Sequence, residues 1–179
     1  DFWVKANVDA GEQVMVMVEK WDEGSNTGWT LADRGGLYFA GTGAAIQTST
    51  QIVPGNWTHI ALRRSGTTIA VFHNGAQIQT TTTSNSFNSS VPLLFGRRRG
   101  GQGFFWNGMI DEIHYFVGTA LSNAQLQAIY NAGSNGVCPP AGCGNGVTDG
   151  SEQCDDGNSV NGDGCDNNCS TSGCGNGIN

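Results

Sequence analysis

One stretch of sequence decides the fold class: Thr67-Thr-Ile-Ala-Val-Phe-His73, then Asn74-Gly75, then Ala76-Gln-Ile-Gln-Thr80. Two strand-like runs flank the Asn-Gly pair, and this pair tolerates the positive φ angles of a two-residue type I′ turn. The stretch therefore predicts a β-hairpin, which is a pair of antiparallel strands.

Further strand-like runs, separated by clusters of Gly, Asn and Ser, occur on both sides of this hairpin. They span residues 2–8, 14–20, 29–33, 36–40, 57–64, 92–96 and 106–116. Many short strands with few helices are typical of a β-sandwich or a β-barrel. Large aromatic side chains on such strands usually belong to the core, and we expect Trp3, Trp57 and Trp106 to pack there.

A single helix is predicted over residues 122–132. Ser122 can cap its N-terminus, Gln125 completes a capping box, and Gly133 suits the position after its C-terminus. Leu126, Ile129 and Tyr130 form one apolar stripe, so we expect the helix to lie against the strands.

Composition excludes several classes of protein. The chain has 179 residues, a net charge of −7 and only 8 Lys and Arg residues, which leaves little basic surface for nucleic acid. No apolar run approaches the ~18 residues that a membrane-spanning helix needs. We expect neither nucleic-acid binding nor membrane insertion.

All six cysteines lie in the last part of the chain, at Cys138, Cys143, Cys154, Cys165, Cys169 and Cys174. This predicts two domains, 1–137 and 138–179. The second carries six acidic residues and no Lys or Arg, and it has too few aliphatic residues to build a core. Disulfides are the expected staple, with a connectivity that spacing alone does not settle, and they imply an extracellular or cell-surface location.

The second domain contains an internal repeat. Cys138-Pro-Pro-Ala-Gly-Cys143-Gly-Asn-Gly returns 31 residues later as Cys169-Ser-Thr-Ser-Gly-Cys174-Gly-Asn-Gly. We interpret the tail as a repeat whose second copy is truncated, and we expect the chain to be part of a longer extracellular protein.

Five segments, in this order, resemble a laminin-G-like domain of the concanavalin A-like superfamily. They are Phe2-Trp3-Val4-Lys5-Ala6, Trp57-Thr-His59-Ile-Ala-Leu62, Phe72-His-Asn74-Gly75, Gly108-Met-Ile110-Asp111-Glu112-Ile113-His-Tyr115, and Ala120-Leu-Ser122 through Gly133. The resemblance covers residues 1 to 134. It implies an all-β, antiparallel jelly-roll sandwich with one short C-terminal helix, followed by the small disulfide-rich repeat.

The resemblance also implies an open sheet edge. Such domains usually carry a further strand before the Phe-Trp-Val-Lys segment, so we expect the strand around Met109 to Phe116 to lack a neighbour and to favour self-association. An acidic residue at the position of Asp111 is associated in the family with a structural calcium ion. The alternative for Asp111 is a carboxylate satisfied by nearby backbone amides.

The tail resembles the acidic four-cysteine repeat of bacterial and protist surface proteins. Oxygen-bearing side chains crowd its centre at Asp155, Asp156, Asn158, Asn161, Asp163 and Asp166. Hard oxygen ligands separated by glycines suit Ca²⁺, which is the expected cofactor. The alternative is a solvated acidic turn held by disulfides.

Two loop-like segments combine aromatic and polar side chains in the way that a sugar or acidic-glycan site does. The predicted ligand-binding residues are Trp21, Asp22, Asn26, Arg97, Arg98, Arg99, Gln102 and Phe104. The triple Arg can equally be a solvated loop tip. Neither a catalytic triad nor the paired-carboxylate motif of related glycosidases is present.

These observations favour a non-catalytic extracellular binding or adhesion module whose partner is a glycan or a surface protein, with a calcium-stabilised spacer repeat. The alternatives are a structural block of an extracellular fibre or stalk, and accessory domains of a larger secreted hydrolase.

Overall fold

A computed structural model of the chain describes residues 1–11, 13–100, 103–133, 148, 153–155, 164–165 and 170–171. The chain divides into two compact units, Asp1–Gly133 and Ser134–Asn179. In the described part of the chain, no helix is long and apolar enough to cross a lipid bilayer.

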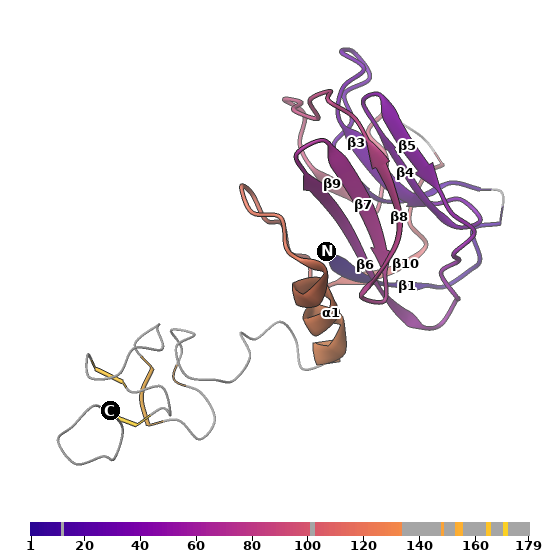
Figure 1. Cartoon of the computed structure of the whole chain (residues 1–179). Helices are drawn as coiled ribbons and strands as arrows, with labels where there is room; N and C mark the ends of the chain where they lie inside the picture. The colour runs from indigo at the N-terminus through magenta and orange to yellow at the C-terminus, as the bar shows by residue number, and fades with distance from the viewer. Residues whose placement is uncertain are drawn as a thin grey trace. The chain divides into compact units, whose positions relative to one another are not determined.

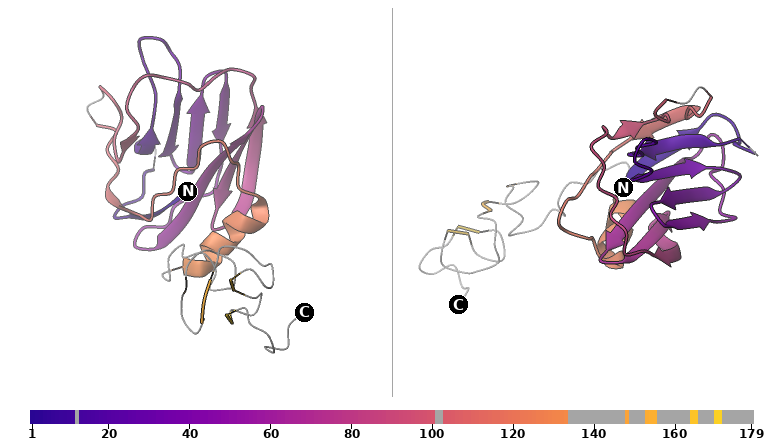
Figure 2. Two further views of the ribbon diagram at one scale, coloured as in Figure 1. Left: turned by 90° about the vertical axis from the view of Figure 1, so that its left-hand side faces the viewer. Right: turned by 90° about the horizontal axis from the view of Figure 1, so that it is seen from above.

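The first unit is a sandwich of two five-stranded antiparallel sheets, as the sequence predicts (Figure 1). The first sheet contains, in spatial order, β10 (Gly108–Asp111), β1 (Phe2–Ala6), β6 (Trp57–Ser65), β7 (Thr68–His73) and β8 (Ala76–Thr82). The second contains β5 (Ala44–Gln47), β4 (Leu37–Gly41), β3 (Trp29–Asp33), β2 (Met15–Glu19) and β9 (Leu94–Phe95). Figure 2 shows the two sheets as separate layers.

The predicted hairpin is confirmed as β7 and β8. His73 pairs with Ala76, which leaves Asn74 and Gly75 as a two-residue turn. Both have positive φ angles, 49° and 76°, as a type I′ turn requires.

The main core lies between the two sheets and consists of large apolar side chains with almost no exposed surface. Its largest members include Phe39, Met17, Leu31, Ile60 and Ile69. Each such side chain contributes roughly 1.5–3 kcal/mol when it leaves water. Trp106 belongs to this core as predicted, whereas Trp57 does not, because 41% of its surface is exposed.

The helix is confirmed as α1 (Asn123–Ala132), with the predicted capping box between Ser122 and Gln125. Leu126 and Ile129 are buried in a second, smaller cluster against the first sheet. This cluster contains Ala61 of β6, whereas its neighbour Ile60 belongs to the main core. Because successive strand side chains point to opposite faces, α1 covers the outer face of this sheet.

Two strand expectations were wrong. The short edge strand β5 is absent from the prediction, because its sequence, Ala-Ala-Ile-Gln, has little β propensity. The strand expected over 106–116 is only four residues long. Its ladder with β1 ends at the Trp3–Asp111 pair, and Glu112 then takes a left-handed conformation with φ 47°.

β10 is an edge strand. It pairs with β1 on one side, and no described residue pairs with it on the other.

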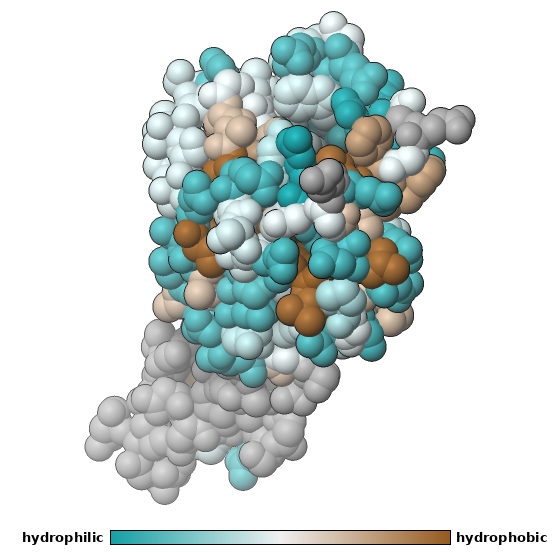
Figure 3. Space-filling model, turned by 90° about the vertical axis from the view of Figure 1, so that its right-hand side faces the viewer, coloured by the Kyte–Doolittle hydropathy of each residue, from teal (hydrophilic) through white to brown (hydrophobic). Residues whose placement is uncertain are grey.

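The side of the sandwich drawn in Figure 3 is largely polar, with apolar side chains in separate spots.

Candidate functional site

The structure brings the two predicted ligand-binding loops together. One loop joins β2 to β3. The other comprises residues 96–100 and 103–105 and runs along β2, where the backbone N–H of Val16 donates to Phe104 O over 3.3 Å. Arg98 connects the loops, because its guanidinium lies 3.1 Å from the Glu23 carboxylate and 3.9 Å from that of Glu19. The two segments therefore form one continuous surface, which we call the loop surface.

Glu19 connects the loop surface to the end of β2. It is the last residue of β2, and only 2% of its surface is exposed. The backbone N–H of Arg99 donates a 2.8 Å hydrogen bond to Glu19 Oε1. Burial raises the pKa of the Glu19 carboxyl, while the Arg99 hydrogen bond and the Arg98 charge oppose that shift.

The β2–β3 loop is ordered by Asp22. Its carboxylate accepts hydrogen bonds from the backbone N–H of Gly24 over 3.0 Å and from the Ser25 hydroxyl over 2.9 Å. The hydrogen bond from Ser25 is the main reason that the pKa of Asp22 is lowered. Asn26 has a φ of 53° and is exposed, which places its amide at the tip of the turn.

The three arginines differ in their surroundings. Arg98 is half-buried, pairs with both glutamates, and lies 5.3 Å from the centre of the Phe104 ring. Arg97 and Arg99 are exposed. Arg98 is therefore occupied within the protein, and the cationic groups open to a ligand are those of Arg97 and Arg99.

The other predicted residues of the loop surface contribute less. Trp21 is half-buried, so only part of its ring is available for stacking. Gln102 lies outside the described residues. That these side chains bind a ligand stays a prediction.

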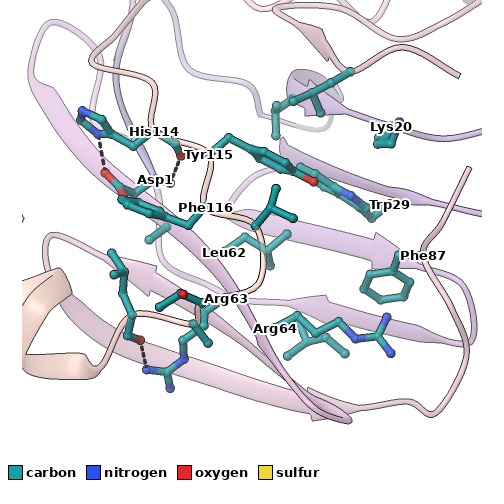
Figure 4. Close-up of a pocket in the computed structure, with 18 of the residues that line it drawn as sticks. Asp1, Lys20, Trp29, Leu62, Arg63, Arg64, Phe87, His114, Tyr115 and Phe116 are labelled. Atoms are coloured by element: carbon teal, nitrogen blue, oxygen red, sulfur yellow. Dashed lines mark hydrogen bonds and ion pairs between the residues drawn. The ribbon is translucent and has the colours of Figure 1, made fainter. Parts of the chain in front are cut away.

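A second feature, which the sequence prediction missed, is a pocket of about 620 Å³ (Figure 4). Its walls come from β6, from the ends of β2 and β3, and from residues 113–121, which cross from β10 to α1. Apolar and aromatic side chains dominate the walls, and Figure 4 places Trp29, Leu62, Phe87, Tyr115 and Phe116 around the opening.

At one end of this pocket, Asp1, His59 and the half-buried His114 form a cluster. Asp1 Oδ1 is 3.4 Å from His59 Nε2 and 3.2 Å from His114 Nδ1. Burial lowers the pKa of His59 to about 4 and also lowers that of His114. Trp3 and Tyr130 surround His59 with aromatic rings 5.4 Å and 6.2 Å away, which agrees with a structural role for this histidine.

The predicted calcium ligands fall in two places. Asp111 is exposed at the end of β10, and its Oδ1 accepts a 2.8 Å hydrogen bond from the backbone N–H of Glu112. Of the acidic set in the tail, Asp155 is described and makes an interaction within the protein, whereas Asp156, Asn158, Asn161, Asp163 and Asp166 lie outside the described residues. No group of three His, Cys, Asp or Glu side chains able to hold a metal ion occurs among the residues that are described.

One disulfide of the tail is described, between Cys154 and Cys165. The positions of Cys138, Cys143, Cys169 and Cys174 lie outside the described residues. Cys165 also forms an isolated β-bridge with Thr171.

Several chains of solved structures are similar to this protein, and two of them are the following. A native heptameric SAP-like pentraxin from Limulus polyphemus has a TM-score of 0.59 and 18% sequence identity, over 77% of this chain and 70% of its own. An S-layer domain-containing protein (residues 221–444) from Clostridium thermocellum has a TM-score of 0.41 and 22% identity, over 73% of this chain and 67% of its own. At this identity the likeness to the pentraxin shows the fold alone.

A comparison with curated proteins finds no match. A family model described as the concanavalin A-like lectin/glucanases superfamily, laminin G type, matches residues 1–127. This match spans both sheets and the start of α1. The chain therefore belongs to the laminin-G-like family of the concanavalin A-like lectin/glucanases superfamily.

Proposed function

We propose that this chain is a non-catalytic extracellular binding module and that its loop surface recognises an acidic glycan or an acidic patch on a surface protein. The observation that carries the proposal is the position of Arg98. By pairing with Glu23 and Glu19, it joins the loop of the exposed Arg97 and Arg99 to the loop that carries Asp22 and Asn26. Exposed guanidinium groups next to amide and carboxylate groups suit the sulfate, carboxylate and hydroxyl groups of a glycan.

A binding role fits this surface better than hydrolysis. The family name covers lectins and glucanases alike, so the family does not decide between them. A glycosidase needs two carboxyl groups that reach the scissile bond. The acidic side chains of this surface are engaged within the protein: Glu19 is 2% exposed and held by Arg99 and Arg98. Glu23 is paired with Arg98, and Asp22 accepts hydrogen bonds from Gly24 and Ser25.

A glycan array tests the proposal. We expect the wild-type protein to prefer sulfated or uronic acid glycans, and the double variant Arg97→Ala/Arg99→Ala to lose most of that signal. Arg34→Ala serves as the control, because Arg34 is an exposed arginine that lies against Tyr38 in the second sheet. Equal binding by the double variant and the control, or no saccharide preference in the wild type, would favour a purely structural block of a fibre or stalk.

For the tail, we propose a spacer stapled by disulfides and loaded with Ca²⁺. The Cys154–Cys165 disulfide supports an oxidising, extracellular location. Asp155 is adjacent to Cys154, so the staple holds at least one acidic group in place. Calcium would neutralise part of the charge of a segment that has six acidic residues and no Lys or Arg.

We also propose that the free side of β10 supports self-association. This strand has a partner only in β1 among the described residues, and unpaired strand edges recruit further strands. Sedimentation over a concentration series, for the wild type and for Met109→Lys, measures this association. Met109 is 49% exposed, and a lysine charge on an edge strand opposes edge-to-edge pairing.

A further inference from the structure

The outer face of the first sheet carries side chains that continue past its contact with α1. Val4 and Ala6 of β1 belong to the core between the sheets, so Trp3 and Lys5 point to the opposite, outer face. The ring of Trp3 stacks on Tyr130 of α1, with 5.9 Å between the ring centres. Lys5 lies two residues further along β1 and therefore belongs to the row of side chains next to that contact.

Three strands contribute to the row at Lys5. The register pairs Lys5 with Trp57 of β6 on one side and with Met109 of β10 on the other. Directly paired residues of neighbouring antiparallel strands project to the same face, with Cβ atoms about 5 Å apart. Trp57 is 41% exposed and Met109 is 49% exposed. This row therefore presents an aromatic ring and a thioether on the two sides of an ammonium group.

The next row contains two amide side chains. The backbone N–H of Asn7 donates to Asn107 O over 2.9 Å, and Asn7 Nδ2 donates to Asn107 Oδ1 over 3.1 Å. Both residues are exposed, and the side-chain amides hold each other side by side. They also line a hollow of about 550 Å³, together with Gln13 and the exposed ring of Phe105. The row thus offers fixed amide groups beside a hollow in the surface.

The dimensions of this surface limit what it can bind. We call its five side chains the sheet platform: Trp57, Lys5, Met109, Asn7 and Asn107. Three strands span two strand spacings, about 10 Å, and the two rows are two residues apart, about 7 Å. A stable protein interface buries about 800 Å² on each partner, which is far more than the sheet platform offers. Its size therefore fits a small saccharide better than the face of a folded protein.

The charge of the sheet platform is positive. Lys5 is its only charged side chain, and Lys5 forms no ion pair with a carboxylate among the described residues. Asp111 lies one row closer to α1, paired with Trp3, and its Oδ1 accepts a 2.8 Å hydrogen bond from the Glu112 N–H. An ammonium group without a carboxylate partner, next to an exposed aromatic ring, suits a ligand that supplies the carboxylate.

We propose that the sheet platform binds a saccharide that carries a carboxylate, such as a uronic acid. The apolar C–H face of the sugar ring would lie on Trp57, the carboxylate would pair with Lys5, and hydroxyl groups would hydrogen-bond to the amides of Asn7 and Asn107. A few placed polar groups beside aromatic surface are typical of small-ligand sites. The sheet platform shares no residue with the loop surface, so the proposal does not depend on binding there.

Methyl β-D-glucuronide is the probe, and methyl β-D-glucoside is its matched control, because it has a hydroxymethyl group in place of the carboxylate. Two-dimensional ¹H–¹⁵N NMR titration of the full chain is the measurement, since it detects weak binding and locates it. We expect the glucuronide to shift the signals of the Trp57 indole and of the backbone amides of Lys5 and Asn107. The glucoside should bind about tenfold more weakly or less, because it lacks the charged acceptor for Lys5.

Two pairs of variants test the position. Lys5→Met removes the charge and keeps most of the side-chain length, so we expect it to weaken glucuronide binding about tenfold. Arg34→Met removes a charge from an exposed arginine outside the sheet platform and should change binding little. Trp57→Ala should weaken binding about tenfold through the loss of the aromatic surface. Its control is Tyr115→Ala, because Tyr115 is an aromatic residue outside the platform that is 59% exposed.

The double variant Arg97→Ala/Arg99→Ala separates this site from the loop surface. It should keep the glucuronide shifts at Lys5 and Trp57, whatever its effect on the glycan array. Failure of the loop surface and failure of the sheet platform are therefore distinguishable.

Four results would overturn the proposal. The first is the absence of glucuronide shifts at Lys5 and Trp57, or shifts confined to the loop of Arg97 and Arg99. Equal binding of the glucoside would mean that Lys5 does not recognise a carboxylate. Equal losses in Lys5→Met and Arg34→Met would indicate an effect of net charge alone. A dimer in sedimentation that Trp57→Ala abolishes, without sugar binding, would mean that a second copy of the chain covers the platform.

Discussion

The backbone N–H of Arg99 donates a 2.8 Å hydrogen bond to the buried carboxylate of Glu19. This contact spans 80 residues of sequence and joins the loop that carries the exposed arginines to the end of β2. The loop surface therefore depends on a carboxylate that no ligand can touch.

Replacing this carboxylate should destabilise the protein. Glu19→Ala leaves the Arg99 N–H without its acceptor and removes one partner of Arg98, so we expect the free energy of unfolding to fall by about 1–3 kcal/mol. Glu23→Gln is the matched control, because the Glu23 side chain is 56% exposed and its pair with Arg98 should be worth about 0–1 kcal/mol. Urea denaturation measures the free energy of unfolding of both variants. Similar losses in the two would show that the Glu19 carboxylate does not hold the arginine loop in place.

Stability should fall in mild acid because of His59. Burial lowers its pKa from 6.5 to about 4, so the folded state favours the neutral ring more strongly than the unfolded chain does. The neutral His59 ring therefore contributes about 2–3 kcal/mol to the free energy of unfolding. This contribution is fully present above pH 6.5 and is lost as the pH falls from 6.5 to about 4. His59→Phe keeps an aromatic ring beside Trp3 and should flatten this dependence. Urea denaturation at pH 7 and pH 4 measures it, and equal slopes in both proteins would contradict the assignment.

The hairpin turn should tolerate little change. Gly75 has a φ of 76°, and a Cβ there would lie 2.8 Å from Gln127 Nε2 and 2.9 Å from Tyr130 Cβ of α1. Gly66→Ala is the control, since Gly66 also has a positive φ, of 59°, but open space around it. We expect Gly66→Ala to cost about 1 kcal/mol from backbone strain alone, and Gly75→Ala to cost clearly more. Thermal unfolding of both variants measures the two losses of stability. Equal losses would mean that α1 shifts away from the added methyl group at no energetic cost.

Proteolysis should separate the two parts of the chain under reducing conditions. If disulfides and calcium order residues 138–179, a reductant together with EDTA should expose this segment to protease while residues 1–137 stay protected. Mass spectrometry of the fragments identifies the cleavage sites. A tail that resists protease after both treatments would refute this account of its order. Treatment with EDTA alone removes bound calcium and leaves the disulfides intact. Cleavage under this condition therefore reports the contribution of the metal by itself.

Part of the candidate site was readable from the sequence. The sequence predicts one binding loop with Trp21, Asp22 and Asn26 and another with Arg97–Arg99, and the structure places the two loops side by side. The chemistry of each loop is local, whereas the role of Arg98 is not. Its partners, Glu19 and Glu23, are about 80 positions away, and no spacing rule connects them.

The pocket beside Asp1 was not readable from the sequence. The residues around Tyr115 resemble a strand, and the prediction extended that strand to 116. A strand needs a partner for its backbone groups, and β10 is paired with β1 only as far as the Trp3–Asp111 pair. At Glu112 the backbone leaves the sheet, and the apolar side chains that follow line the pocket.

By itself, the sequence determined the elements whose geometry is local. Asn74-Gly75 specifies the hairpin because few residues tolerate two successive positive φ angles, and Ser122 with Gln125 specifies the start of α1 because capping needs only four residues. Tertiary structure alone decided the burial of Glu19, the exposure of Trp57 and the formation of the pocket beside Asp1. Each of these depends on which chain lies alongside a given strand, and strand pairing joins residues so distant in sequence that no local pattern encodes it.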